Sequence, residues 1–232
     1  MHPLLRPHDR HDLTGRPAPA RLAYPAGDVL VVSGLPGSGK STLMRRCARA
    51  AVIDSQHTRA AFARALPGVP YALYRPLVRV AHYLRLRAAV RAGGPLVVHD
   101  CGTLPWVRRA LARSAARQGR RLHLLLLDAS PAQAADGQRR RGRRVSRYAF
   151  ARHRRAWAAL RALATAEGPL PPGVASAVLL PRAAAARLRT IEFTTVTGQL
   201  DAPLPGQIPG PIPAPRPAPA PPREPLPATT SG

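Results

Sequence analysis

A glycine-rich loop that ends in a lysine and two hydroxyl residues is the part of this sequence best suited to chemistry. Residues 34–42 read Gly-Leu-Pro-Gly-Ser-Gly-Lys-Ser-Thr, which matches the whole Walker A pattern G-x-x-x-x-G-K-[ST]. Glycines let the backbone turn tightly and bring its N–H groups against phosphate oxygens, and the N-terminus of a following helix adds a positive dipole. The loop therefore predicts binding of a nucleoside triphosphate.

The polar residues of the loop have separate expected roles. Lys40 supplies a compact charge for the β- and γ-phosphates, and the Ser41 hydroxyl is a ligand for Mg²⁺. Lys40 is also the one lysine among the 36 Lys and Arg residues of the chain, as expected if a guanidinium cannot replace an ammonium in so small a loop. With ATP and Mg²⁺ as the predicted cofactors, the expected nucleotide-binding residues are Gly34, Leu35, Pro36, Gly37, Ser38, Gly39, Lys40, Ser41 and Thr42.

Two aspartates that follow short apolar runs are the candidate acidic groups of the site. Asp100 follows Leu96-Val97-Val98-His99 and is predicted to hold Mg²⁺ together with Ser41. The alternative is that Asp100 caps the next helix. His99 has no assigned role, since it could equally be a core histidine.

Asp54 follows the apolar run Ala50-Ala51-Val52-Ile53, at the place where a phosphate acceptor would approach. A carboxylate there can accept the proton of an attacking hydroxyl, and Arg59 could pair with it or with an anionic substrate. We therefore take Lys40, Asp54, Asp100 and Arg59 as catalytic candidates. The alternative for Asp54 is an aspartate at a helix N-terminus, stabilised by the helix dipole.

Nine arginines and no acidic residue lie between positions 139 and 155. One interpretation is a lid in which some of these arginines close over the nucleotide and stabilise the transferring phosphoryl group. The other is a solvated helix face. We expect at least one of them to contact the nucleotide, and take Arg139 and Arg143 as the candidates.

Short apolar segments alternate with amphipathic ones, which indicates an α/β fold with a parallel sheet and helices on both faces. The predicted strands are 29–33, 50–53, 95–99, 122–127 and 174–180, and a last helix is predicted over 183–193. We thus expect a three-layer P-loop NTPase domain with a five-stranded sheet over residues 27–195. Residues 1–26 are predicted to be a flexible arm, and the Pro/Ala-rich residues 196–232 a disordered tail.

Composition limits the classes of partner and compartment. The formal net charge of +25 permits a nucleic-acid partner, but arginine is spread along nearly every helix, so a compositional bias explains much of the charge. No apolar run approaches the roughly 20 residues that span a bilayer, and the N-terminus lacks the apolar core of a signal peptide. Cys47 and Cys101 are the two cysteines, as in a protein with reduced thiols. We expect a cytoplasmic protein with no membrane contact.

The loop at 34–42, the segment from Asp54 to Arg59, residues 98–103 and the arginine-rich segment together resemble the small P-loop kinases of the AAA-family ATPase type. This group is related to the polynucleotide 5′-kinases and zeta toxins, and the arginine-rich composition is similar to that of actinobacterial proteins. The resemblance implies a five-stranded core and transfer of the ATP γ-phosphate to a hydroxyl. In the polynucleotide-kinase pattern an aspartate lies two or three residues before the arginine after strand two, whereas here those positions are Gln56 and His57.

Two functions follow from these observations. The first is a kinase that uses ATP and Mg²⁺ to phosphorylate an unidentified acceptor, either a small molecule or a nucleic acid. The second is an ATPase switch or binding module that acts with a nucleic acid or protein partner.

Overall fold

Strands and helices alternate along the chain. This computed structural model describes residues 3–100, 104–140 and 147–195. The strands in these residues are β1 (Leu4–Leu5), β2 (Asp9–Asp12), β3 (Arg21–Pro25), β4 (Val29–Gly34), β5 (Ala51–Ile53), β6 (Leu96–His99), β7 (Leu122–Asp128), β8 (Val174–Pro181) and β9 (Thr190–Thr194). The helices are α1 (Lys40–Cys47), α2 (Ser55–Ala65), α3 (Tyr71–Ala92), α4 (Pro105–Ala116), α5 (Pro131–Arg139), α6 (Arg147–Thr165) and α7 (Arg182–Arg187).

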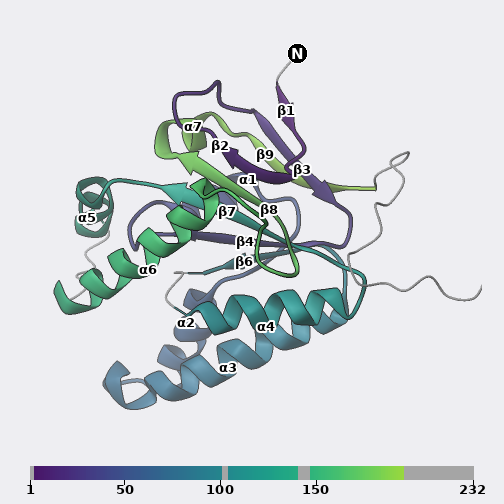
Figure 1. Ribbon diagram of the computed structural model, residues 1–232. Coiled ribbons are helices and arrows are strands. Elements are labelled where there is room, and N and C mark those ends of the chain that lie inside the picture. Colours follow the sequence, from purple (N-terminus) through teal and green to yellow (C-terminus); the bar gives the residue numbers. More distant parts are fainter. Residues whose placement is uncertain (1–2, 101–103, 141–146, 196–232) are drawn as a thin grey trace, which may run out of the picture. The chain divides into compact units, whose positions relative to one another are not determined.

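A parallel sheet of six strands, in the order β2-β8-β7-β4-β6-β5, forms the centre of the fold (Figure 1). A second, parallel sheet of three short strands has the order β1-β3-β9 and lies on the side of α1 and α7. The predicted α/β fold with a parallel sheet flanked by helices is confirmed. The predicted number of five strands is wrong by one, because β2 adds a sixth strand at the edge beside β8.

Side chains of the central strands alternate between two hydrophobic cores. On β4, Val29 and Val31 pack with residues of α3, α4 and α6, while Leu30 and Val32 pack with residues of α1, α7 and the small sheet. All four side chains are fully buried. Both faces of β4 are thus covered, which explains why its sequence is continuously apolar rather than alternating.

The N-terminal segment is not the flexible arm that the sequence predicts. Its residues form β1, β2 and β3, and β2 pairs in parallel with β8 from Asp9 to Asp12. The Arg10 side chain also donates hydrogen bonds to the carbonyls of Leu163 and Pro169, at 2.9 and 3.2 Å. Main-chain pairing and the Arg10 side chain therefore hold β2 in place. Because the side chains of β2 are all polar, its sequence has no hydrophobic periodicity from which the strand could be predicted.

The last helix is shorter than predicted. The expected helix over 183–193 is the short α7 followed by β9, because the backbone turns to the extended region at Leu188. The side chains of Leu188 and Ile191 are buried in the core on the side of the small sheet. The predicted tail over 196–232 lies outside the described residues. Among the described residues, none of the helices is both long enough and apolar enough to cross a membrane.

A buried hydrogen-bonded pair lies at the amino-terminal ends of the central strands of the large sheet. His123 Nε2 lies 2.9 Å from Asp28 Oδ2, and His123 Nδ1 lies 2.8 Å from Ser176 Oγ. The other oxygen of Asp28 accepts a hydrogen bond from the Arg121 backbone N–H at 2.9 Å. Both members of the pair are almost wholly shielded from solvent.

We expect Asp28→Ala to lower the free energy of unfolding by about 2 kcal/mol or more, because it leaves the buried His123 Nε2 and the Arg121 backbone N–H without their hydrogen-bond partner. Urea unfolding followed by circular dichroism measures the change. The control is Glu192→Ala, which removes the more exposed pair with Arg21 and should cost less than about 1 kcal/mol. Equal losses in the two variants would contradict this account of the Asp28 pair.

Candidate functional site: a phosphate-binding loop beside a buried carboxylate

The loop between β4 and α1 has the conformation of an anion-binding turn. Ser38 N–H donates to the Leu35 carbonyl at 3.0 Å, and Gly39 is the N-cap of α1 with a left-handed φ of 105°. The helix begins at Lys40, so the N-terminus of α1 opens onto the loop. Such a terminus presents unpaired N–H groups and a positive dipole to an anion.

Two buried polar side chains face into this loop. The ammonium of Lys40 donates to the carbonyls of Gly34 and Leu35, at 2.7 and 3.0 Å. The Ser38 hydroxyl is buried, and the described residues offer it no hydrogen-bond partner. Leaving such a group unpaired costs about 1–3 kcal/mol. The loop therefore fits a ligand that brings its own acceptor oxygens, as a phosphate does.

Helix α5 packs directly on the loop through two glycines. A Cβ atom on Gly37 would lie 2.0 Å from the Ala134 carbonyl oxygen, and one on Gly137 would lie 2.2 Å from the Gly37 oxygen. The Gln138 side chain also donates to the Pro36 carbonyl at 3.0 Å. Glycine is thus required on both sides of this contact, which holds α5 over the phosphate-binding loop.

A cavity of about 290 Å³ opens beside the loop. Gly37, Ser38, Gly39 and Thr42 form one wall, and two arginines, Arg140 after α5 and Arg182 at the start of α7, face them from other elements. Arg140 also pairs with Asp136 at 3.0 Å, and Arg182 donates to the Gln133 carbonyl at 3.2 Å. The cavity combines backbone N–H groups with guanidinium groups, which suits a polyphosphate.

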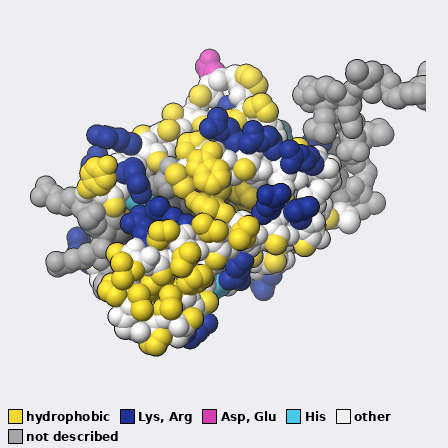
Figure 2. All heavy atoms as spheres, turned by 90° about the horizontal axis from the view of Figure 1, so that it is seen from below, with side chains coloured by type: hydrophobic (Ala, Val, Ile, Leu, Met, Phe, Trp, Pro, Cys, Tyr) yellow, Lys and Arg dark blue, Asp and Glu magenta, His cyan; other side chains and the backbone are white. Residues whose placement is uncertain are grey.

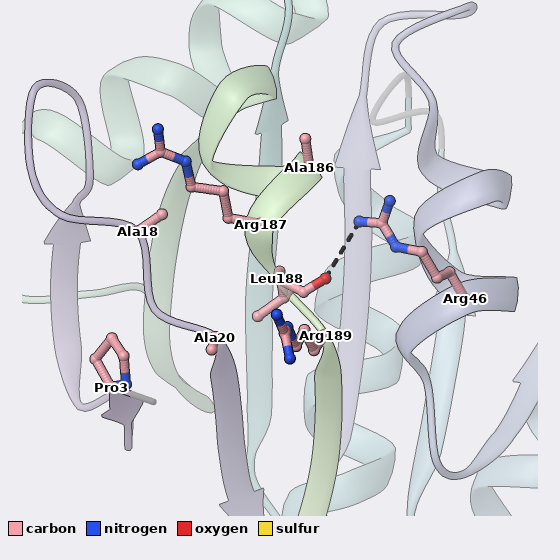
Figure 3. A pocket seen from close by; sticks show the side chains of 8 residues that line it. All are labelled: Pro3, Ala18, Ala20, Arg46, Ala186, Arg187, Leu188 and Arg189. Carbon is pink, nitrogen blue, oxygen red and sulfur yellow. Dashed lines mark hydrogen bonds between the residues drawn. The ribbon is translucent and has the colours of Figure 1, made fainter. Parts of the chain in front are cut away.

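A second cavity of about 530 Å³ lies away from the loop, between α7 and the small sheet (Figure 3). The described residues that line it include Arg187 and Arg189 and no carboxylate. Arg46 of α1 lines both cavities and donates to the Leu188 carbonyl at 3.2 Å, so it joins α1 to the segment after α7. The glycine-rich loop does not contribute to this second cavity.

Asp54 is the acidic residue that the structure brings to the loop. Its Oδ2 accepts a hydrogen bond from the Ser41 hydroxyl at 3.3 Å, and its Oδ1 accepts one from the Gln56 backbone N–H at 2.9 Å, which caps α2. His99 Nδ1 lies 3.0 Å from Asp54 Oδ1, close enough for an ion pair but not aligned for a good hydrogen bond. Both interpretations of Asp54 thus have support, since it caps a helix and also contacts the predicted magnesium ligand.

Burial and contacts act in opposite directions on the Asp54 carboxyl. Burial alone would raise its pKa, but the contacts with His99, Gln56 and Ser41 outweigh burial and lower the pKa below its ordinary value. Burial lowers the pKa of the nearby His82, whose Nδ1 is buried and has no hydrogen-bond partner among the described residues. The site therefore combines an ionised carboxylate with an imidazole that favours its neutral form.

Asp100 lies after β6 but makes different contacts. Its Oδ2 accepts from the Ser33 hydroxyl at 3.4 Å and pairs with Arg108 at 3.3 Å. The alternative role as a helix cap is not observed, because the N-cap of α4 is Leu104, without a side-chain cap. Asp128, which also follows a predicted strand, pairs with Arg161 at 3.4 Å.

The other predicted site residues are placed as follows. Arg59 stacks over the Tyr71 ring at 4.0 Å, rather than pairing with Asp54. Arg139 is exposed and pairs with Asp136 at 3.5 Å, while its neighbour Arg140 lines the cavity. Arg143 lies outside the described residues.

Sequence reasoning missed Arg182 and His82, and it gave His99 no role. Arg182 is the first residue after β8, so the rule that ligands bind at the carboxyl ends of parallel strands could have found it. His82 has no comparable signal, because it lies in the middle of α3 on the face that packs inward.

Comparison with known families identifies the domain. A family model described as an AAA domain matches residues 29–166, which is more than half of the chain. The chain belongs to the AAA domain family. This confirms the resemblance to AAA-type P-loop proteins and the expectation of a nucleotide-binding domain. No curated protein matches the chain.

Solved structures similar to the chain include several kinases. A gluconokinase from Sinorhizobium meliloti is 18% identical over 70% of this chain and 94% of that one, with a TM-score of 0.42. The Mycobacterium tuberculosis APS kinase CysC is 20% identical over 68% and 89%, with a TM-score of 0.36. A structure from the Streptococcus pneumoniae PezAT toxin–antitoxin system is 16% identical over 50% of this chain, with a TM-score of 0.42, and the chain spans about half (52%) of its length.

The glycine contact between α5 and the loop gives one prediction. Gly137→Ala should weaken nucleotide binding at least about tenfold, because the new Cβ displaces the loop backbone, although alanine in a helix interior is ordinarily about 1 kcal/mol more favourable than glycine. Titration with a fluorescent ATP analogue measures the affinity. The control Ala132→Gly, at an exposed position of the same helix, should leave the affinity unchanged. An unchanged affinity in Gly137→Ala would show that the contact does not shape the loop.

The lowered pKa of Asp54 gives a second prediction. A carboxyl whose pKa is lower in the folded chain adds stability above its ordinary value of 3.8, and this stability is lost as the pH falls below that value. In metal-free buffer, urea unfolding between about pH 2 and pH 6 should thus show a steeper acid loss in the wild type than in Asp54→Asn. Parallel curves for the two proteins would contradict the proposed effect of the Asp54 contacts.

Proposed function

We propose that this protein is a kinase that transfers the γ-phosphoryl group of ATP to a hydroxyl group. The observation that carries the proposal is the buried Asp54 carboxylate in contact with Ser41, directly beside a Walker A loop. Phosphoryl transfer needs an acidic group near the loop to hold Mg²⁺ or to orient the nucleophile, and Asp54 supplies one. The AAA domain family and the kinases among the similar structures agree with this proposal.

The triphosphate is expected to bind along the loop and the 290 Å³ cavity. The loop N–H groups and the Ser38 hydroxyl would donate to phosphate oxygens, and Lys40 would exchange its loop carbonyls for the β- and γ-phosphates. Arg140 and Arg182 would supply the further positive charge, replacing Arg139 as the arginine expected in this role.

The hydroxyl of Ser41 and the carboxylate of Asp54 fit Mg²⁺, which prefers oxygen ligands and commonly keeps several waters. When bound, Mg²⁺ would neutralise charge that develops on the phosphate oxygens. Asp100, which the sequence predicts as the carboxylate ligand of Mg²⁺, contacts Ser33 and Arg108, and we therefore propose Asp54 for this role.

In the transfer step the acceptor oxygen forms a bond to the γ-phosphorus, and the bond to the β,γ-bridging oxygen breaks, so that ADP leaves with the electron pair. Asp54 is ionised and would accept a hydrogen bond from the acceptor hydroxyl and orient it. Because its lowered pKa makes Asp54 a weak base, the proton would pass to water or to an oxygen of the transferred phosphoryl group. His99 lies against Asp54, and His82 is near enough to both residues for their charges to act on it. A neutral imidazole at His82 would offer the acceptor a hydrogen bond without adding charge.

The test compares ADP release in the presence and absence of acceptors with free hydroxyl groups: sugars, nucleosides and 5′-hydroxyl oligonucleotides. Lys40→Ala should lower turnover at least about a hundredfold, because it removes a charge that stabilises the transferring phosphoryl group. Asp54→Asn should lower acceptor-dependent release to a similar degree and, in Mg²⁺-free buffer, leave the affinity for ATP within a few fold. Asp128→Asn is the matched control and should retain full turnover.

A different pattern would favour the second function, an ATPase switch. In that case ADP release would be indifferent to Asp54→Asn and would rise only when RNA or DNA is added. The net charge of +25 favours this alternative, because a strongly basic protein attracts nucleic acids. Repeating the stimulation at increasing salt separates a specific partner from bulk charge, since non-specific binding weakens steeply with salt.

A further inference from the structure

Helix α3 carries two apolar stripes on opposite faces. The inner stripe, buried against the fold, is Tyr74, Val78, His82, Leu86 and Val90. The outer stripe, which we call the outer seam, is Leu73, Leu77, Val80 and Leu84, with 72%, 58%, 57% and 61% of their surfaces exposed. A helix that is apolar on two opposite faces is normally covered on both. Among the described residues nothing covers the outer seam.

The spacing of the outer seam is that of a helix-pairing surface. The steps from Leu73 to Leu77, Val80 and Leu84 are four, three and four residues, which is the heptad spacing of coiled-coil contacts. Trp106 of α4 is half exposed and contacts Tyr83 of α3 edge to face at 5.2 Å, which adds exposed apolar surface beside α3. Isolated exposed leucines are common, but a contiguous row of this length marks an interaction surface.

The charge around the outer seam has one sign. Helix α3 contains five arginines and no acidic residue; the arginines are Arg75, Arg79, Arg85, Arg87 and Arg91. If the heptad spacing is continued past Leu84, the next two positions are Arg87 and Arg91, both exposed. Figure 2, seen from the side of α3, shows hydrophobic side chains interspersed with arginines and very few acidic groups.

We infer that the outer seam of α3 binds an amphipathic helix of a partner protein whose apolar stripe is flanked by aspartate or glutamate. The leucines and valine would pack against the apolar stripe, and Arg87 and Arg91 would pair with acidic residues near one end of the partner helix. This surface lies on the face of α3 opposite His82, so the inference does not depend on the proposed kinase activity.

Charge distinguishes this occupant from two others. A second copy of the chain would bring five more arginines and no acid to the contact, so like charges would face each other. The segment 197–232 contains two acidic residues and two arginines, and therefore offers no net negative charge. An acidic helix satisfies both the apolar row and the arginines.

The experiment uses the full-length protein and three synthetic 21-residue peptides. One has leucine at the heptad contact positions and glutamate at the flanking positions; the second has lysine in place of glutamate; the third has the composition of the first in scrambled order. Fluorescence anisotropy of the labelled peptides at physiological salt measures the affinities. We expect the acidic heptad peptide to bind at least about tenfold more tightly than either of the others.

Variants assign the binding to the outer seam. Leu77→Glu with Leu84→Glu should weaken binding of the acidic peptide at least about tenfold, whereas Tyr148→Glu, at an exposed hydrophobic position of α6, should not change it. Arg87→Glu with Arg91→Glu should reverse the preference toward the lysine peptide. Thermal unfolding of each variant checks that the fold is kept, as expected for exposed side chains.

Three outcomes would overturn the inference. Equal binding of the scrambled acidic peptide would show that charge alone attracts it. Failure of every peptide would show that the outer seam does not accept a helix or is covered within the full chain. A dimer in sedimentation velocity that Leu77→Glu with Leu84→Glu dissociates would assign the surface to a second copy.

Discussion

The site depends on the register of β4 between its two parallel neighbours. Val32 is paired with His99 of β6, and Gly34 with Leu127 of β7, so these strands end at one edge of the sheet. The glycine-rich loop, Asp54 and Asp100 all follow strands that end at this edge. A slip of one residue would turn the side chains of a strand to the opposite faces and separate Val31 and Val32 from their cores. The two close-packed cores thus keep the glycine-rich loop, Asp54 and Asp100 at the same edge of the sheet.

Three charged groups of the site each have partners within the protein. Lys40 is solvated by two carbonyls of its own loop, and Arg140 is paired with Asp136. Asp54 is stabilised by a hydroxyl, a backbone N–H and an imidazole. A triphosphate would have to compete for these cations, while the unpaired Ser38 hydroxyl gains an acceptor. Binding is therefore an exchange of partners in a preformed site, which requires little reorganisation of the backbone.

The sequence predicted the parts of the fold that have a strong local signal. The loop, the strands on either side of β4 and the helix after it follow from apolar runs and glycine spacing. The strand β2 could not be predicted in this way, because Asp9-Arg10-His11-Asp12 has no apolar face and is held by main-chain bonds to β8. The end of α7 was also missed, although Thr190 and Ile191 are β-branched and favour a strand.

Prediction of the site was limited by contacts between distant segments. In the sequence, Asp54 and Asp100 occupy the same kind of position, because each directly follows a predicted strand. Only the three-dimensional arrangement shows that Asp54 contacts Ser41 while Asp100 contacts Arg108. Arg59 illustrates the same limit, because its position one turn into α2 permits a contact with Asp54, but the Tyr71 ring offers its guanidinium a cation–π contact.

Helix α3 shows how one element serves both the site and the surface. Its inner stripe carries His82 toward Asp54, and its outer seam begins on the same turns, with Leu73 beside Tyr74 and Leu77 beside Val78. Rotation of the helix to bury the outer seam would expose Leu86 and Val90, which belong to the larger core. The fold therefore cannot cover both stripes of α3 with the same neighbours, and the apolar row can be removed from water only by something placed on the outside of the helix.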